Sequence, residues 1–212
     1  VLYSFKNPKS YFINNVEATK VICDISKKYR IKKFIFGSSS SIYGDQKKYP
    51  IKENFKPNPK NPYAKTKLMS EKLVLNKFKN TNINFLIFRF FTVYGPFGRP
   101  DMFIHKFLNK IKTKDSIKLH NHGLNYRDFT YVGDVVNANI AAAISDKVGA
   151  GEVINVGNGD NRSVNQIADL IGGDRINIPP RIEPRETLAN IKKAKELLNW
   201  EPTQKIEEWM PK

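Results

Sequence analysis

The sequence lacks the features that would assign a chain to a class at sight, namely paired cysteines, a long apolar run and a cluster of metal ligands. Its single cysteine, Cys23, excludes a disulfide framework and a cysteine-built zinc site, and we expect it to be a small core residue of a helix. No run approaches the ~20 apolar residues that a membrane span needs, and residues 1–6 hold no apolar signal segment, so we expect no membrane partner. His120 and His122 have no carboxylate or cysteine at ligand spacing, which predicts that there is no metal site.

The composition is that of an ordinary globular protein. Of the 212 residues, 40% are hydrophobic and 26% are charged, which is enough to build a core without covalent cross-links. The formal net charge is +16, from 36 Lys and Arg against 20 Asp and Glu. Because the lysines are spread along the chain rather than gathered in one tract, we expect no nucleic-acid partner, although a basic nucleic-acid-binding module stays open as an alternative of a different class. A basic surface also suits a phosphorylated, doubly anionic small substrate.

Hydrophobic periodicity in the first half predicts alternating helices and strands. The expected ranges are helices at 12–29 and 63–79, buried strands at 33–36 and 83–90, and polar loops at 37–41 and 45–62. Val16, Val21 and Ile25 recur at helical spacing and mark the core face of the first helix. This order predicts βαβ units and a parallel, doubly wound α/β sheet.

The second half is less regular, although the same patterns recur. The expected ranges are strands at 117–120, 128–132 and 152–156, and helices at 102–112, 134–144, 163–171 and 191–198. Ser163 is the expected N-cap of its helix, and Trp200 is the expected packing anchor after the last one. Neither an internal repeat nor a Gly/Ser linker marks a domain boundary in the sequence.

A dinucleotide-binding sheet normally opens with Gly-x-Gly-x-x-Gly or a variant between its first strand and first helix, and this sequence has none. Gly149 and Gly151, like Gly157 and Gly159, have the wrong spacing and precede strand or turn signals. Either the fold is not of the Rossmann type, or its first βαβ units are missing. Since the sequence also lacks an initiator methionine, we expect the chain to be a fragment.

Ser39, Tyr63 and Lys67 form the strongest candidate for a catalytic group. Tyr63 and Lys67 are four residues apart on an expected helix and therefore share one face. An ammonium near a phenol favours the phenolate, which predicts a lowered pKa for Tyr63 and a general base for a hydroxyl group. Ser39 follows a buried strand at its carboxyl end, where open α/β sheets build their sites. Because Tyr-x-x-x-Lys alone arises often by chance, its meaning depends on the neighbouring motifs.

Several further motifs occur along the whole chain. They are FIFGSSSSIYGD at 34–45, PYAKTK at 62–67, RFFTVYGP at 89–96, RPDM at 99–102, RDFTY at 127–131 and LLNWEP at 197–202. In these motifs the sequence resembles the extended short-chain dehydrogenase/reductase family and its NAD-dependent epimerase/dehydratase branch, most closely the UDP-glucuronate 4-epimerases. The resemblance implies NAD as the cofactor and a UDP-sugar as the substrate.

The resemblance also implies an architecture. It predicts a Rossmann-like, doubly wound parallel sheet whose first βαβ units are missing, with a smaller, interleaved α/β substrate-binding region. Residues 1–95 would be the C-terminal part of the NAD-binding domain, and 96–212 mainly the nucleotide-sugar-binding region, with 127–157 returning to the NAD-binding domain. The glycine loop and the acidic residue that holds the adenosine ribose would lie upstream, because a segment like residues 11–16 comes well after them in the family.

The resemblance assigns catalysis to Ser39, Tyr63 and Lys67. Tyr63 would take the proton of the sugar 4-hydroxyl, and Ser39 would bond the same hydroxyl and help to move the proton. Lys67 would hold the nicotinamide ribose and tune Tyr63. The residues expected to contact NAD are Asn15, Ser38, Tyr63, Lys67 and Phe91.

Substrate contacts are implied for Ser39 and for residues of the later motifs. Thr92 stands at a substrate-contacting position, and Arg99 stands where a uronic acid carboxylate needs a permanently charged, bidentate partner. Arg127 and Arg181 would hold the diphosphate, and Glu183 the uridine ribose. The family usually has Arg-Pro-Gly followed by Asp or Glu at the last position, whereas this chain has Arg-Ile-Glu and is one residue shorter.

Plainer interpretations of these residues stay open. Arg127 followed by Asp128 also suits a surface ion pair, and Arg99 also suits a turn. Residues 38–41 also suit a polar loop, and Asn15 the surface of a helix.

The implied reaction is epimerisation at C4 of a UDP-sugar, by preference UDP-glucuronate to UDP-galacturonate, through a 4-keto intermediate in a cytoplasmic homodimer. Another nucleotide-sugar epimerase or a 4,6-dehydratase of the same family is the alternative. A dehydratase needs an acid/base pair after the serine, usually Asp-Glu, and decarboxylases usually carry Glu at position 41, whereas this chain has Ser40 and Ser41. Without a pyrophosphate-binding loop, these 212 residues alone are expected to fold and bind NAD poorly and to be inactive.

Overall fold

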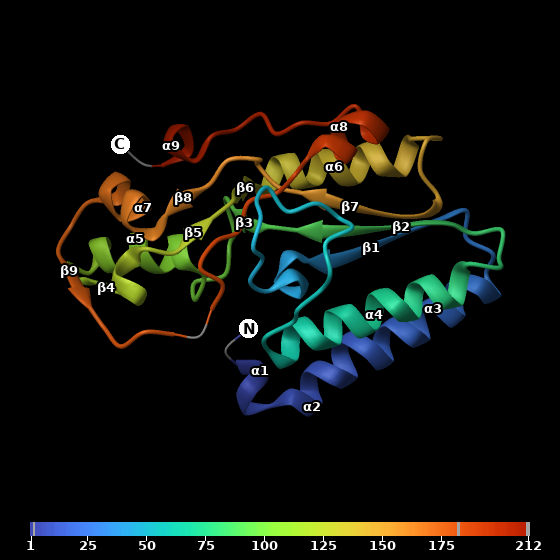
Figure 1. Ribbon diagram of the computed structural model, residues 1–212, viewed down its shortest axis with the longest axis horizontal. Coiled ribbons are helices and arrows are strands. Elements are labelled where there is room, and N and C mark those ends of the chain that lie inside the picture. The colour runs from blue at the N-terminus through green and yellow to red at the C-terminus, as the bar shows by residue number, and fades with distance from the viewer. Residues whose placement is uncertain (2, 182, 211–212) are drawn as a thin grey trace.

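Three parallel strands form the central sheet of the molecule (Figure 1). They are β1 (Lys33–Ser39), β2 (Asn84–Phe90) and β7 (Ala150–Val156), in the order β1-β2-β7. The structure is a computed structural model, and it describes residues 1, 3–181 and 183–210. The parallel register between β1 and β2 confirms the predicted doubly wound α/β class.

The side chains of β2 explain why both faces of this sheet are covered. Phe85 and Ile87 point to one face and Leu86 and Phe88 to the other, and all are almost fully buried. Apolar residues at successive positions are typical of a strand buried on both faces, as predicted for 83–90. The helices that cover the two faces are α3 (Ala18–Lys28) with α4 (Pro62–Phe78), and α6 (Val132–Ile144) with α8 (Lys192–Leu198) (Figure 1).

The first predicted helix is continuous, but it is not α-helical throughout. The short turns α1 (Tyr3–Lys6) and α2 (Pro8–Tyr11) lead into the π-helix η1 (Phe12–Glu17) and then into α3. Cys23 is fully buried between α3, α4 and the sheet, as predicted. The prediction that Val21 and Ile25 belong to the core is wrong, because α3 turns Cys23 inward and leaves those side chains 54% and 46% exposed.

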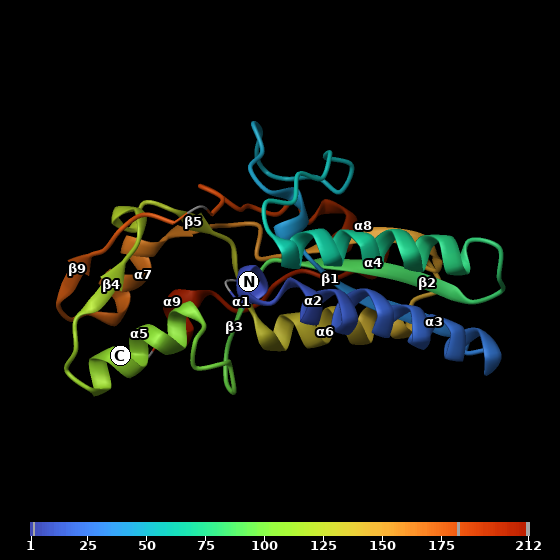
Figure 2. The ribbon, with the colours of Figure 1, turned by 90° about the horizontal axis from the view of Figure 1, so that it is seen from below.

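The end of β1 differs from the prediction. Residues 37–39, expected to be a loop, stay paired with β2, and the chain leaves the sheet only at the 3-10 helix η2 (Ser40–Tyr43). Ser38 and Ser39 therefore stand on a rigid strand end. The excursion 45–61 contains no regular helix or strand, as predicted, and it projects at the top of Figure 2.

A second group of elements forms the smaller region. The strands pair as β3–β6 and β4–β9, both parallel, and as the antiparallel β5–β8. β4 and β6 lie within the predicted strands 117–120 and 128–132, whereas β3, β5, β8 and β9, also of two or three residues, were not predicted. The elements are β3 (Thr92–Tyr94), α5 (Phe103–Lys112), β4 (Ile117–Leu119), η3 (Asn121–Gly123), β5 (Tyr126–Arg127), β6 (Phe129–Tyr131), β8 (Arg162–Ser163), α7 (Val164–Ile171), β9 (Arg175–Asn177) and α9 (Ile206–Trp209).

The C-terminal segment returns to the central sheet. α8 and Trp200 pack in the same core as α6 and β7, and the Trp200 indole N–H donates to the Asp134 carbonyl at 2.9 Å. Trp200 is thus the packing anchor that was predicted. From the expected range 127–157, α6 and β7 pack in the central core, as do residues 192–200. The division of the chain into an NAD-binding domain and a substrate-binding region stays a prediction. Over the described part of the chain, the helices are too short or too polar to span a membrane.

Candidate active site

Ser39 and Tyr63 meet at the carboxyl end of β1. Ser39 is the last residue of the strand and 9% exposed, and its side chain lies close enough to the Tyr63 phenol to lower the pKa of that group. The start of α4 is set by Asn61, whose side-chain oxygen accepts the Ala64 N–H at 2.8 Å, and by Pro62 in the first turn. Because the cap fixes where the helix begins, it places Tyr63 in the first turn of α4, at the sheet edge.

Burial dominates the titration of Tyr63. It raises the pKa of the phenol above its ordinary value of about 10, and the nearby Tyr11, whose ring stands edge-on at 6.0 Å, raises it further. The side chain of Ser39 and the positive charge of Arg99 lower it less strongly. The prediction that Lys67 lowers this pKa below the ordinary value is therefore wrong.

Lys67 lies one turn along α4 from Tyr63, as predicted, but its ammonium is directed at the sheet. Its Nζ donates to the Gly37 carbonyl at 2.7 Å and lies 4.9 Å from the centre of the Phe36 ring. Burial lowers the pKa of Lys67, and the carboxylate of Glu71 raises it. Since an ammonium has three N–H donors, the contact with Gly37 leaves donors for a ligand hydroxyl.

The residues beside Lys67 fit the nicotinamide-ribose end of NAD. The Ser38 hydroxyl is buried, with the residue 4% exposed, and it has no hydrogen-bond partner within the described ranges. A buried polar group of this kind normally has a partner, which here is the role a ligand hydroxyl or amide would take. The printed sequence contains no glycine-rich phosphate loop, so only this end of the cofactor site is assigned to named residues.

Asn15 and Phe91, the other expected NAD contacts, have partners within the protein. The side-chain amide of Asn15 donates to Thr66 Oγ1, and the backbone carbonyl of Asn15 accepts from Ser70 Oγ, both at 2.9 Å. These bonds hold η1 against α4. The Phe91 ring is 5% exposed and packs against Tyr43. These side chains serve packing, and their contact with NAD stays a prediction.

A pocket of about 210 Å³ brings together four of the expected substrate contacts, Thr92, Arg127, Arg181 and Glu183, while Ser39 lies outside its lining. Arg127 forms an ion pair with Glu183 at 3.0 Å, so the alternative of an Arg127–Asp128 surface pair is wrong. Ile182, in the shortened motif after Arg181, lies outside the described residues. The lining residues are Val1, Phe5, Ser40, Ser41, Lys60, Asn61, Thr92, Arg127, Arg181, Glu183, Pro184 and Thr187.

Arg99 lies outside that pocket. Its side chain is 68% exposed, and its Nε and Nη2 donate to the two carboxylate oxygens of Asp101 at 3.0 and 2.8 Å. This bidentate bond uses the side edge of the guanidinium and leaves Nη1 without a partner among the residues described. The charge of Arg99 still acts on the Tyr63 pKa, so the guanidinium lies near the tyrosine.

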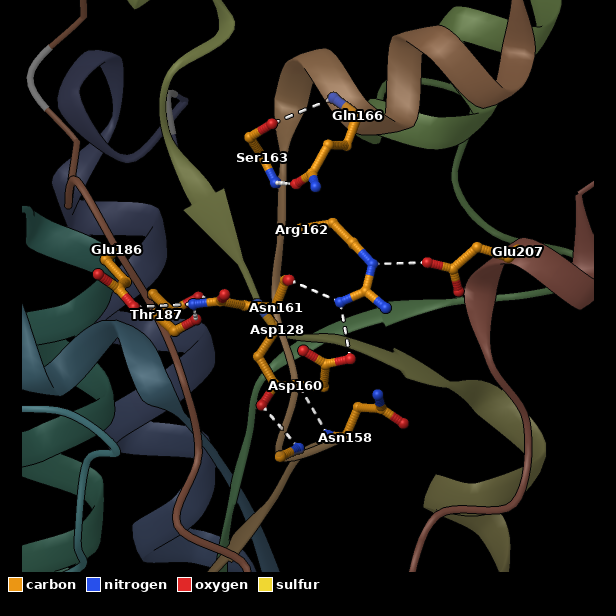
Figure 3. Close-up of polar contacts among 11 residues, drawn as sticks. Asp128, Asn158, Asp160, Asn161, Arg162, Ser163, Gln166, Glu186, Thr187 and Glu207 are labelled. Carbon is orange, nitrogen blue, oxygen red and sulfur yellow. Dashed lines mark hydrogen bonds and ion pairs between the residues drawn. The ribbon is translucent and has the colours of Figure 1, made fainter.

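Asp128 is a supporting residue that the sequence analysis treated only as an ion-pair partner. Its fully buried carboxylate accepts the backbone N–H group of Asn158 at 2.6 Å (Figure 3). It also accepts the backbone N–H groups of Gly159 and Ala189 at 3.0 Å each. Burial raises the pKa of Asp128 to about 6, and these bonds oppose the rise. Because Asp128 directly follows Arg127, the bonds fix Arg127 relative to the loop after β7 and to the C-terminal segment.

The loop that Asp128 holds continues into α7 through further polar contacts (Figure 3). Arg162 pairs with Asp160 at 2.7 Å and with Glu207 at 2.5 Å. Ser163 caps α7, with its hydroxyl accepting the Gln166 N–H while the Gln166 side chain accepts the Ser163 N–H. The predicted N-cap at Ser163 is confirmed.

A buried ion pair joins α4 to β2, and the sequence analysis missed it. Arg89 Nε and Nη2 donate to the two carboxylate oxygens of Glu71 at 3.0 and 2.7 Å, and the side chains are 6% and 3% exposed. Arg89 also donates to the Tyr43 hydroxyl at 2.9 Å. The available signal was the spacing of Tyr63, Lys67 and Glu71, which places all three on one helical face.

Known proteins are similar to this chain in sequence and in fold. Residues 1–157 match the family described as "NAD dependent epimerase/dehydratase family". A UDP-glucuronate 4-epimerase of Thermodesulfobacterium geofontis is 38% identical, over 97% of this chain and 65% of that protein. UDP-glucuronic acid 4-epimerase from Bacillus cereus, solved with UDP-glucuronic acid and NAD, is 33% identical with a TM-score of 0.88, over 95% of this chain and 66% of that one. UDP-glucose 4-epimerase from Thermotoga maritima, solved with UDP-glucose, is 29% identical with a TM-score of 0.92, over 98% of this chain and 70% of that one.

The chain spans about two thirds of the length of the curated relatives it matches. Within that span the α/β fold follows the solved structures, and the resemblance inferred from the motifs is confirmed. The chain therefore belongs to the NAD dependent epimerase/dehydratase family.

Proposed function

We propose that the full-length product of the gene encoding this chain inverts C4 of a UDP-sugar, with UDP-glucuronate as the preferred substrate and NAD as the cofactor. The observation that carries the proposal is the placement of Ser39, at the end of β1, and Tyr63, in the first turn of α4, at one sheet edge beside a pocket lined by Arg127 and Arg181. Hydroxyl and phenol provide for proton transfer, and the guanidinium groups provide for binding of a diphosphate. The relatives include epimerases of several UDP-sugars, which supports a UDP-sugar as the substrate but does not choose among the sugars.

The proposed mechanism gives each side chain one task. Tyr63 Oη, as phenolate, takes the proton of the 4-hydroxyl and later returns it. NAD, held at this end of the site, would supply the hydride acceptor and donor that inversion at C4 requires. Ser39 Oγ holds the 4-oxygen and stabilises the phenolate with its hydrogen bond, while Lys67 and the buried Ser38 hydroxyl hold the nicotinamide ribose end.

Epimerisation suits the site better than dehydration. A 4,6-dehydratase must eliminate water and needs a carboxylic acid and a carboxylate after the serine. Here the pocket presents the hydroxyls of Ser40 and Ser41 at those positions. A serine hydroxyl does not ionise near neutral pH, so this chain offers no acid/base pair there for the elimination.

Arg99 supports glucuronate as the preferred substrate. Its Nη1 is not used by Asp101, and an exposed arginine beside the catalytic tyrosine can bind the carboxylate of a uronic acid end-on. A neutral hexose would leave that guanidinium without a partner in the substrate.

We also propose a homodimer, formed through α3. Val21, Ile22 and Ile25 on this helix are 54%, 52% and 46% exposed, and a contiguous apolar patch of this kind typically marks a protein interface. Light scattering should give the mass of two chains, and Ile22→Asp should give the mass of one. We also propose a cytoplasmic location for the protein.

The test incubates the full-length protein with UDP-glucuronate and NAD and separates the products by chromatography. We expect UDP-galacturonate without net formation of NADH. Tyr63→Phe should lower turnover by about 100-fold or more while NAD binding is retained. Tyr29→Phe, the same change at a residue 70% exposed, is the matched control and should leave turnover unchanged. Turnover by Tyr63→Phe at the wild-type rate would refute the proposal.

A further inference from the structure

Ser41 has no role in the mechanism above, yet both of its hydrogen-bonding groups point at the catalytic serine. Its backbone N–H donates to Ser39 Oγ at 3.2 Å, and its own Oγ lies 2.9 Å from Ser39 Oγ. Both contacts follow from the 3-10 helix η2, of which Ser39 is the N-cap. Ser41 is half-buried and lines the pocket that contains Arg127.

The hydrogen-bond capacity of a hydroxyl makes these contacts directional. Ser39 Oγ has one proton to donate and two lone pairs that accept. The Ser41 N–H occupies one lone pair. When Tyr63 is a phenolate it can only accept, so the Ser39 proton must point to Tyr63, and the Ser41 hydroxyl must then donate into the second lone pair. Both donors of Ser41 thus hold the Ser39 proton in the direction of the phenolate.

We propose that Ser41 is a positioning residue that sets the direction of the Ser39 hydroxyl proton and thereby stabilises the ionised form of Tyr63. The inference rests on the proposed function in so far as it treats Tyr63 as the base. Without the Ser41 hydroxyl, the Ser39 hydroxyl loses one of the two donors that fix the direction of its O–H bond. The O–H group then also adopts orientations in which it does not donate to the phenolate. The ionised tyrosine is then less stable, because burial already opposes its charge.

Ser40 provides a matched control. It is half-buried like Ser41 and lines the same pocket, but within the described residues its hydroxyl has no bond to Ser39. Ser40→Ala therefore removes the same atom from the same surface without touching the catalytic serine. Ser41→Thr keeps the hydroxyl and should rescue the effect of Ser41→Ala.

The first experiment measures kcat/KM against pH for the full-length protein with UDP-glucuronate and with UDP-glucose. In Ser41→Ala we expect the acidic limb of the profile to shift to higher pH by roughly half to one pH unit. At pH values below that limb, kcat/KM should be about three- to tenfold lower than in the wild type. A change of this size corresponds to the loss of one neutral hydrogen bond. The shift should be the same for both substrates, absent in Ser40→Ala and reversed in Ser41→Thr. A profile unchanged in Ser41→Ala would overturn the proposal, and so would a shift seen only with UDP-glucuronate, since Ser41 would then act on the carboxylate of the substrate.

The second experiment needs no cofactor or substrate. Tyrosine labelled with ¹³C at Cζ reports ionisation of each phenol by NMR, and Tyr63→Phe identifies the resonance of Tyr63. The Tyr63 titration should lie at higher pH in Ser41→Ala than in the wild type and in Ser40→Ala, and an equal midpoint would overturn the proposal. A wild-type protein without epimerase activity would refute the proposed function alone, because the NMR titration still decides on Ser41.

Discussion

Removing one member of the buried Glu71–Arg89 ion pair should destabilise the protein more than removing both. The Arg89 guanidinium is 6% exposed and donates to both oxygens of Glu71, to the Tyr43 hydroxyl and to the Glu53 carbonyl. Glu71→Gln preserves the volume, but it turns one acceptor oxygen into an NH₂ group that faces an N–H of Arg89. The guanidinium then keeps its full charge in a desolvated site without a counter-ion.

The loss in free energy of unfolding depends on which buried polar groups each variant leaves without a partner. Breaking a buried pair from one side typically costs about 3–5 kcal/mol, which we expect for Glu71→Gln. Replacing both partners by apolar residues, as in Glu71→Leu with Arg89→Met, removes the stranded charge. The Glu53 carbonyl and the Tyr43 oxygen then each lose one donor, which costs about 1 kcal/mol per bond. We therefore expect the double variant to lose only about 1–2 kcal/mol.

Urea unfolding of the full-length protein, followed by tryptophan fluorescence, gives the free energy of unfolding of each variant. Glu201→Gln is the control, because its ion pair with Lys195 is at a comparable distance of 2.6 Å but has side chains 64% and 49% exposed, and its loss should change little. The double variant is compared with its own single variants, Glu71→Leu and Arg89→Met. If its loss in free energy of unfolding equals the sum of their losses, the residues are not coupled and the reasoning from desolvation is refuted.

Other parts of the structure give further predictions. Because burial raises the pKa of folded Asp128 to about 6, above the roughly 3.9 of an unfolded Asp, stability from this group is present below about pH 4 and lost as the pH rises through 6. Asp128→Asn should remove that slope from the melting temperature, and an unchanged slope would contradict the assignment. A Cβ on Gly157 would lie 2.4 Å from the Ala189 Cβ, so Gly157→Ala should lower the free energy of unfolding by about 1–3 kcal/mol in a urea titration, and wild-type stability would count against this contact. Arg99→Gln should raise KM for UDP-glucuronate about tenfold or more and leave KM for UDP-glucose nearly unchanged, whereas equal effects in steady-state assays would exclude a carboxylate contact.

The central sheet could be predicted from the sequence because its strands are buried on both faces. Residues 83–90 are almost all apolar, and the helix at 63–79 shows its start by Asn61 and Pro62. β3, β5, β8 and β9 could not be predicted, since they are defined by their partners rather than by their own residues. The pairing of β5 with β8, for example, joins Tyr126 to Ser163 and Arg127 to Arg162, which are 37 and 35 positions apart.

The candidate site was predictable to the extent that it is local. The motifs place Ser39 at a strand end and Tyr63 with Lys67 on one helical face, and the structure agrees. The supporting carboxylates were not predictable, because their partners are distant in sequence: Asp128 binds a backbone segment near 158 and Glu71 binds Arg89. Protonation was not predictable either, since a pKa depends on burial, and burial is decided by the tertiary structure.

The pKa of Tyr63 decides how the rest of the site must act. Burial and Tyr11 raise this pKa, and Ser39 and Arg99 lower it. If Arg99 binds the carboxylate of a uronic acid, its charge is largely compensated and helps the phenolate less. When Arg99 binds a substrate carboxylate, the ionisation of Tyr63 depends more on the Ser39 hydroxyl. The hydrogen bond from Ser41 to Ser39 therefore contributes a larger share of the stabilisation of the phenolate with UDP-glucuronate than with a neutral sugar. Recognition of the uronic acid and ionisation of Tyr63 therefore both depend on the Arg99 guanidinium. Ser39 and Ser41, at the end of β1, stabilise the Tyr63 phenolate independently of the substrate carboxylate.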